Sequence, residues 1–255
     1  MEILLTNDDG IFAPGLAAAY HRLRKLGNVT VVAPTDSRSG TGHSVTISSP
    51  LVCNRIEIEG QFTGYGVHGS PADCVKLAVM QLHEKPIDLV VAGINNGANI
   101  GINVYYSGTV AAAMEGAFLG IPAVAVSLAT EQDMDFDKAA RYFTNVLEKL
   151  MPIEPGSVIN INVPPLSNGP PRGVKVVPQS TKALQERYIV HRNDTAGAVF
   201  ELAGATHHID DNLTDTAALT EGFITVTALA ADMTDHEKNR RLMEIQWHQI
   251  PLSGD

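Results

Sequence analysis

Residues 1–12 read MEILLTNDDGIF, a short apolar run that ends in two adjacent acids. The run from Ile3 to Leu5 has the composition of a parallel strand that is buried on both faces. Asp8 and Asp9 follow at the end of this strand, and Gly10 comes next. Adjacent carboxylates repel each other there unless a cation lies between them. Gly10 permits a turn of the backbone, so both side chains can face one ion.

Strand-like and helix-like segments alternate through the first two thirds of the chain. The predicted strands are Ile3 to Leu5, Val29 to Ala33, Asp88 to Ala92, residues 121–127 and Val158 to Val163. The predicted helices are Pro14 to Leu26, a helix opening at Pro71 after a Ser70 cap, residues 107–120, and Asp135 to Leu150. This alternation predicts an α/β fold with a doubly wound, mostly parallel, Rossmann-like sheet. Sheets of this kind bind ligands at the carboxyl ends of their strands.

The composition argues against several classes of protein. The only cysteines are Cys53 and Cys74, outside any CxxC pair, so we expect neither a disulfide framework nor a cysteine zinc site. A formal net charge of −10 argues against a nucleic acid polymer as partner. The sequence after Met1 has no basic leader, and no apolar run approaches the roughly 20 residues of a membrane span. We therefore expect a cytoplasmic protein that does not enter a membrane.

Four loops are predicted at one edge of the sheet, each rich in oxygen-bearing or amide-bearing side chains. They read TNDDGI, PTDSRSGTGHS, AGINNGANIG and the SGT before an alanine-rich helix. Asp8 and Asp9, with a serine from the second loop and an asparagine from the third, form an oxygen-rich set suited to Mg²⁺, Mn²⁺ or Ca²⁺. The sequence therefore predicts a hard-cation site at this edge.

Each loop also has a purely structural explanation. An Asp-Asp pair at a strand end forms helix caps and solvated turns. The SRSGTGHS stretch is typical of a surface turn as well as of a nest of N–H groups that receives an anion. The asparagines of INNGAN suit turns with positive φ, and SGTVAAAMEG suits an N-cap whose helix start also binds phosphate. The functional interpretation rests on the four loops meeting at one edge.

Seven motifs, in this order along the chain, resemble one known family. They are NDDG, RSGTG, GSPADCV, INNGAN, YSGTVAAAMEGAFLG, NINVP and TDTAALTEGFITVTAL. Together they resemble the stationary-phase survival protein SurE family of metal-dependent 5′/3′-nucleotidases, from Met1 to about Asp232. Ser70 replaces the usual threonine of the family's GTPADC motif, which keeps the hydroxyl.

The resemblance implies a phosphomonoesterase that hydrolyses nucleoside 5′- and 3′-monophosphates to nucleoside and phosphate. It implies one divalent cation per subunit, Mg²⁺ or Mn²⁺, held by Asp8, Asp9, Ser39 and Asn95. We expect water to attack directly, with Asp8 or Asp9 as the base.

The resemblance also implies a set of phosphate-binding residues in the second, third and fourth loops. These are Gly40, Asn99, Ser107, Gly108 and Thr109, of which Asn99 and Ser107 are also expected to be catalytic. Backbone N–H groups at the helix start would share in this binding.

The last third of the chain departs from the alternating pattern. We expect residues 1–177 to form the catalytic core, and residues 178–255 to supply an irregular excursion, a returning strand in GFITVTALA and a terminal helix in residues 235–250. The excursion exceeds an ordinary connection and suits a hairpin that packs on a partner. The resemblance implies a homodimer or homotetramer that exchanges C-terminal segments.

Three other functions remain open on the residues alone. An aspartyl phosphatase also places an acid after its first strand, although its two acids are separated by one residue. A nucleotide sensor would need the anion nest but not the paired acids. A nucleoside hydrolase would use adjacent acids for calcium and release free base. Of the histidines, His43 comes first as a further site candidate because it lies in the second loop.

Overall fold

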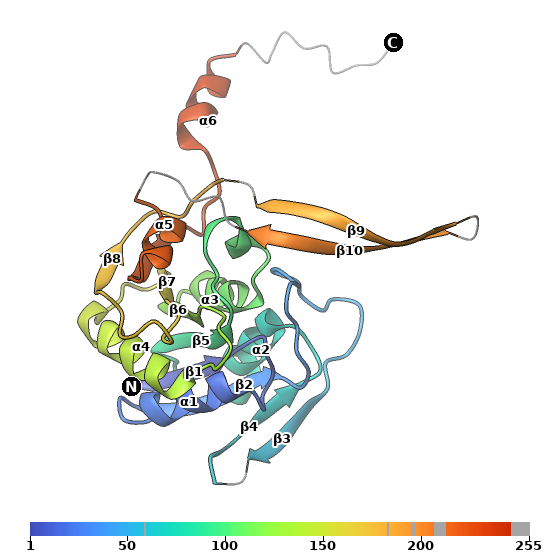
Figure 1. Ribbon diagram of the computed structural model, residues 1–255. Helices are drawn as coiled ribbons and strands as arrows, with labels where there is room; N and C mark the ends of the chain where they lie inside the picture. Colours follow the sequence, from blue (N-terminus) through green and yellow to red (C-terminus); the bar gives the residue numbers. More distant parts are fainter. Residues whose placement is uncertain (59, 183, 195–196, 207–212, 246–255) are drawn as a thin grey trace, which may run out of the picture.

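One central sheet organises the protein (Figure 1). The computed structural model describes residues 1–58, 60–182, 184–194, 197–206 and 213–245. The nine strands of the sheet follow the order β3-β4-β2-β1-β5-β6-β7-β11-β8. The strands are β1 (Glu2–Thr6), β2 (Asn28–Pro34), β3 (Cys53–Ile58), β4 (Phe62–Val67), β5 (Leu89–Asn96), β6 (Ala123–Leu128), β7 (Val158–Val163), β8 (Val174–Val176) and β11 (Ile224–Leu229).

Helices connect these strands and cover the sheet. They are α1 (Pro14–Leu23), α2 (Pro71–Leu77), the π-helix η1 (Ala78–Leu82), the 3₁₀ helix η2 (Gly101–Tyr105), α3 (Gly108–Phe118), α4 (Phe136–Leu150), α5 (Asp215–Thr220) and α6 (His236–Met243). Within the described residues no helix is long and apolar enough to cross a membrane.

The first strand lies in the middle of the sheet, as its composition predicts. β1 pairs in parallel with β2 on one side and β5 on the other, so that Ile3 lies opposite Val29 and Leu89. Within this nine-stranded sheet, β3 with β4 and β11 with β7 are the antiparallel pairs, and the other neighbours are parallel. The predicted mostly parallel sheet is confirmed.

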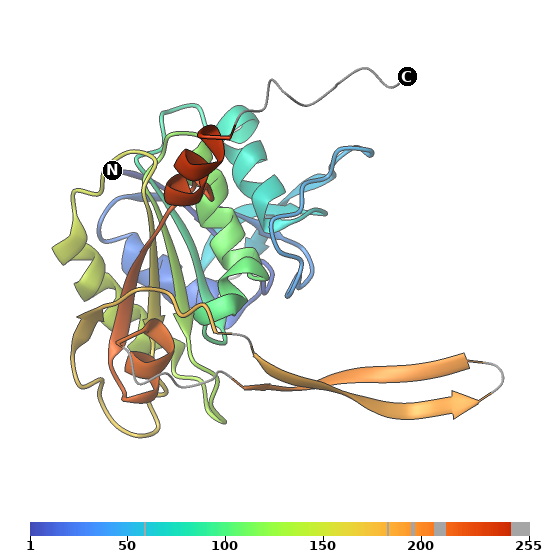
Figure 2. The ribbon, with the colours of Figure 1, turned by 90° about the horizontal axis from the view of Figure 1, so that it is seen from above.

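Two hydrophobic cores lie on the two faces of the sheet. On one face, α1 and α4 bury Leu16 and Phe143 against the strands. On the other face, α2 and α3 bury Val75 and Val110. Figures 1 and 2 show the two helix pairs on opposite sides of the strands. The sheet is therefore doubly wound, which brings the starts of α1, α2 and α3 to its carboxyl edge.

The N-cap residues that the sequence indicates for two helices match the structure. Ser70 caps α2, and its hydroxyl accepts a bond from Asp73 N while Asp73 Oδ2 accepts one from Ser70 N. Asp135 caps α4 by accepting from Lys138 N at 2.9 Å. Both helices thereby satisfy N–H groups that the first turn leaves without partners.

Some boundaries and elements differ from the sequence-based expectation. α1 ends at Leu23, three residues before the predicted Leu26, because residues 24–26 form a turn. β5 extends to Asn96, beyond the predicted Ala92. The β3–β4 hairpin and the short strand β8 were not predicted. Their sequences carry turn residues and charges that hide the alternation of a half-buried strand.

A long hairpin stands away from this body (Figure 2). It consists of β9 (Gln185–Asp194) and β10 (Gly197–Thr206), which pair only with each other in the described part of the chain. This confirms a hairpin in the irregular excursion. The returning strand is β11, between β7 and β8, so the last third of the chain also completes the central sheet. The predicted terminal helix is α6, which ends at Met243, and residues 246–250 lie outside the described residues.

Candidate active site

The two adjacent acids lie in a tight turn at the carboxyl end of β1. Asn7 holds this turn, because its Nδ2 donates to Gly10 O at 2.9 Å and its Oδ1 accepts from Gly10 N at 3.2 Å. Gly10 has φ of +104°, which side chains with a Cβ rarely adopt. The turn releases Asp8 and Asp9 from the alternation of the strand, as the sequence predicts.

Three other segments contact these acids. The Arg38 N–H of the second loop donates to Asp8 O at 2.7 Å. The Asn96 N–H at the end of β5 donates to Asp9 Oδ2 at 3.0 Å. The Thr109 hydroxyl at the start of α3 donates to Asp8 Oδ1. The four loops therefore meet at one place.

Helix α3 begins directly against Asp8. Ser107 is its N-cap and accepts from Val110 N at 3.0 Å. A Cβ on Gly108 would lie 2.8 Å from Asp8 Cβ, so only glycine permits this approach. The partial positive charge of a helix start favours a carboxylate there. The contacts place one acid at the N-terminus of α3.

The environment of both acids disfavours their charged forms. Burial raises the pKa of Asp8 to about 6, and the charge of Asp9 adds to this, although bonds from Thr109 oppose it. Burial also raises the pKa of Asp9, against the bond from Asn96 N. Asp8 is only 3% exposed. In the described part of the chain, no lysine, arginine or histidine forms an ion pair with either carboxylate. Among the described residues, the pair thus lacks a counter-charge.

The chemistry of the donors fits a hard cation. Asn95 is buried and commits its Nδ2 to Gly97 O at 2.7 Å, so its side-chain oxygen is the atom left for an ion. Ser39 is exposed on the second loop, 3.2 Å from Ser37 between hydroxyl oxygens, next to the Arg38 that contacts Asp8. Among the described residues, no three His, Cys, Asp or Glu side chains share a metal-binding cluster. A mixed set of two acids, an amide and a hydroxyl suits Mg²⁺ or Mn²⁺.

The predicted phosphate-binding residues differ in how far their side chains are already engaged. Asn99 is buried, and its Nδ2 donates to Ser127 Oγ at 2.9 Å while its backbone is held by Asn160 and Asn162. The Thr109 hydroxyl serves Asp8, as described above. Gly40 is exposed with φ of +72° and open space around it. Their assignment to phosphate stays a prediction.

One hollow borders Asp9, and a second one begins at Ser107, the N-cap of α3. One, of about 310 Å³, is lined by Asp9, Asn96 and Phe12 among others. The other, of about 330 Å³, runs along α3 from Ser107 and includes Tyr105. A substrate therefore has room beside Asp9, and a second space lies along α3 beyond Ser107.

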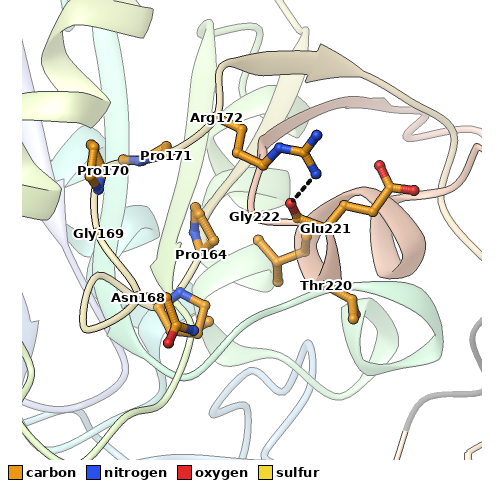
Figure 3. Close-up of a pocket in the computed structure, with 12 residues that line it drawn as sticks. Pro164, Asn168, Gly169, Pro170, Pro171, Arg172, Thr220, Glu221 and Gly222 are labelled. Atoms are coloured by element: carbon orange, nitrogen blue, oxygen red, sulfur yellow. Dashed lines mark hydrogen bonds between the residues drawn. The ribbon is translucent and has the colours of Figure 1, made fainter.

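A separate cavity of about 460 Å³ lies beyond the ends of β6 and β7 (Figure 3). It is lined largely by prolines and glycines, with Pro164 and Gly222 in view, and Arg172 donates to Glu221 O at 3.1 Å. None of the predicted site residues lines it. This cavity is therefore separate from the candidate site at Asp8 and Asp9.

Sequence reasoning missed a charged cluster behind the second loop. Glu115, buried in the middle of α3, lies 2.6 Å from Lys76 Nζ and 2.9 Å from His43 Nε2. The available signal was a glutamate in an otherwise alanine-rich buried helix, because such a charge needs partners.

The fold and this geometry define a class: a doubly wound α/β protein with an acidic, oxygen-rich site where a first strand meets a helix start. Comparisons with known proteins then give the family. The family model described as "Survival protein SurE" matches residues 3–186. A protein from Rhodopirellula baltica named 5′-nucleotidase SurE is 48% identical over 92% of this chain and 94% of its own length. One from Syntrophus aciditrophicus with the same name is 44% identical over 93% and 91%.

The solved structures agree with this result. The crystal structure of the SurE protein from Aquifex aeolicus superposes with a TM-score of 0.82 at 36% identity, covering 96% of this chain and 100% of that one. The chain belongs to the survival protein SurE family.

Proposed function

We propose that this protein is a metal-dependent nucleotidase that hydrolyses nucleoside 5′- and 3′-monophosphates to nucleoside and phosphate. The observation that carries the proposal is the pair formed by the buried Asp8 and the half-buried Asp9, which has no counter-charge among the described residues and of which Asp8 lies against the start of α3. The relatives named 5′-nucleotidase SurE support the reaction class.

Asp8, Asp9, Ser39 and Asn95 would hold one divalent cation per subunit, with Mg²⁺ or Mn²⁺ preferred by their oxygen donors. When bound, the cation supplies Lewis-acid stabilisation to the phosphoryl oxygens. It would also explain why two acids with raised pKa values stand together in a buried turn.

The phosphate would lie between the cation ligands and the start of α3. Ser107 keeps its hydroxyl hydrogen for a phosphate oxygen, because its oxygen accepts from Val110 N. The N–H of Gly108 and one remaining N–H of Asn99 would act with it, and backbone N–H groups near Gly40 would close the other side.

A water molecule would attack phosphorus in line with the ester oxygen, which leaves with the nucleoside. Asp8 accepts from the Thr109 hydroxyl and is the more deeply buried of the two acids. Asp9 accepts one bond, from Asn96 N, and borders a hollow. We therefore assign the proton of the attacking water to Asp9, and orientation of the site to Asp8.

We further propose that the protein acts in the cytoplasm as a homodimer or homotetramer. Residues 1–177 would carry the catalytic core, and residues 178–255 would provide the exchanged segments. The support is the hairpin β9–β10, which makes its sheet contacts within itself, and α6, which buries none of its side chains. β11 belongs to the central sheet, so exchange concerns the hairpin and α6.

The test is phosphate release from nucleoside 5′- and 3′-monophosphates by wild type and Asp9→Asn. Release should stop with EDTA and return with Mg²⁺ or Mn²⁺. Since a metal ion contributes several kcal/mol, we expect kcat to fall at least about a hundredfold in the variant. Glu148→Gln, at an exposed position near the C-terminal end of α4, is the matched control and should keep wild-type activity.

Retained activity in Asp9→Asn would refute the ligand and base assignments. Free base without phosphate would indicate a nucleoside hydrolase instead. Nucleotide binding without turnover would indicate a sensor.

A further inference from the structure

We propose that His43 is a positioning residue that holds the metal-binding loop in place through Glu115. The loop is the segment of residues 35–52 between β2 and β3, called here the β2–β3 loop. The inference rests on the proposed function, because it concerns the predicted metal ligand Ser39 within that loop.

Ser39 depends on its neighbours for its position. Its side chain contacts Ser37, which belongs to the same loop. On one side of Ser39, the Arg38 N–H donates to Asp8 O at 2.7 Å. On the other side, the Gly42 N–H donates to Tyr106 O at 3.0 Å. The place of Ser39 is therefore set by the points where the loop is tied to the body.

His43 supplies the side-chain tie that follows directly after Gly42. Its Nε2 lies 2.9 Å from Glu115 Oε2, and its ring stacks on Phe118 with centroids 5.3 Å apart and planes 4° apart. Glu115 and Phe118 are three residues apart on α3, so they share a face. A hydrogen bond in the ring plane and a stack on the ring face together fix the imidazole in one orientation.

Glu115 is suited to this role because it is buried and fully partnered. It is 3% exposed, with Lys76 Nζ 2.6 Å from Oε1 and His43 at Oε2. A buried carboxylate without partners is costly, so this one retains both. His43 therefore binds to a rigid acceptor.

Helix α3 connects the tie to the catalytic acids. Its first turn holds Asp8 through Thr109, and its middle holds the loop through Glu115 and His43. One rigid helix thus sets both Asp8 and the segment that carries Ser39. Loss of the tie should loosen Ser39 relative to Asp8 while leaving the acids in place.

A second set of contacts holds the loop from Ser44 onward, directly after His43. Ser70 Oγ donates to Ser44 O at 2.6 Å, and Thr46 donates to Asp73 from its N–H at 2.9 Å and from its hydroxyl at 2.7 Å. These contacts keep the loop folded when His43 is changed, while Lys76 still pairs with Glu115 and water can replace the ring of His43, whose side chain is 30% exposed. A variant of His43 should therefore alter the metal site more than the stability.

The experiment measures Mn²⁺ binding to the full chain by electron paramagnetic resonance of the free ion, alongside urea unfolding. His43→Ala should weaken Mn²⁺ binding about tenfold, the lower end of what residues that orient metal ligands contribute. The urea midpoint of the apoprotein should stay near that of wild type. His43→Gln should recover most of the affinity, because its amide can donate to Glu115.

His83→Ala is the matched control. His83 lies 3.6 Å from Glu2 Oε2 at the start of β1, the end of the strand away from Asp8. Its loss removes a histidine that lies near a glutamate without a hydrogen bond to it, far from the metal-binding loop, and Mn²⁺ affinity should remain at the wild-type value.

An unchanged Mn²⁺ affinity in His43→Ala would overturn the proposal. So would a loss of affinity that follows a lowered urea midpoint or that His43→Gln does not recover. A wild type that binds neither Mn²⁺ nor Mg²⁺ would overturn the metal site and this inference together. Mn²⁺ binding without phosphate release would refute only the nucleotidase, and the effect of His43→Ala would still support the positioning role.

Discussion

The carboxyl edge of the sheet and the β9–β10 hairpin differ in how far their side chains are exposed. At the edge, Asp8 and Thr109 are almost fully buried and bonded to each other. On the hairpin, large apolar side chains face outward, with Tyr188 67% and Phe200 55% exposed. The side chains of the first region bond within the chain, whereas the second presents an apolar surface that indicates an interaction. Catalysis and assembly should therefore respond to different substitutions.

The largest loss of activity should follow from adding one methyl group to Gly108, next to Asp8. In Gly108→Ala, the new Cβ would lie 2.8 Å from Asp8 Cβ and 3.0 Å from its Oδ2. Either Asp8 or the first turn of α3 has to move, and a displacement of about 1 Å lowers rate by on the order of a hundredfold. We expect that loss in kcat/KM for phosphate release, measured with saturating Mg²⁺.

Gly116→Ala on the same helix is the matched control. Its Cβ would lie 2.8 Å from Val90 Cγ2 in the core, away from the paired acids. Overpacking there should lower the free energy of unfolding by about 1–3 kcal/mol. It should leave kcat/KM within a few-fold of wild type, since Asp8 is untouched. Equal loss of activity in both variants would contradict the role assigned to Gly108.

Substitutions on the β9–β10 hairpin should change the self-association of the protein. Tyr188 and Phe200 pack edge to face with centroids 6.3 Å apart, on opposite strands. Replacing both with serine should weaken self-association by at least about thirtyfold, because a buried aromatic at an interface contributes 2 kcal/mol or more. Light scattering across a concentration series measures the change, and the unfolding of the monomer should change little.

Met80→Ser is the control for this pair. Met80 is 55% exposed on η1, so the change also removes an exposed apolar side chain but leaves the hairpin intact. Unchanged association in the hairpin variant, or equal loss in Met80→Ser, would refute assembly through the hairpin.

The sequence predicted the carboxyl edge well because its signals are local. The strand that ends in Asp8 and Asp9, the Ser70 cap and the helix after Ser107 each follow from a few neighbouring residues. The alternation of strands and helices then brings these loops together.

Contacts between distant residues were not predictable in this way. The bond from Thr109 to Asp8 joins positions 101 apart, and His43 meets Glu115 across 72. The sequence shows that these four side chains are polar, but which of them pair depends on how α3 packs on the sheet. β8 illustrates the same limit, since the position of a three-residue strand at the sheet edge depends on its pairing with β11.

The smallest predicted effect lies between the two regions, at the cap of α2. Asp73 is 1% exposed and accepts bonds from Ser70 and Thr46, so it joins the helix to the β2–β3 loop. Burial alone would raise its pKa, but these bonds outweigh burial and lower it. Asp73→Asn keeps the shape and removes the charge. We expect a loss of about 1 kcal/mol in the free energy of unfolding at pH 7.

The pH dependence of that loss distinguishes the charge from the shape. A carboxylate whose pKa is lowered by folding stabilises the protein above its unfolded pKa of about 3.9, and this contribution disappears as pH falls through the folded pKa. The difference between wild type and Asp73→Asn in urea unfolding should therefore stay constant from about pH 7 to 5 and shrink below about pH 4. A difference independent of pH would show that the bonds of the cap, rather than the ionised carboxylate, connect α2 to the loop.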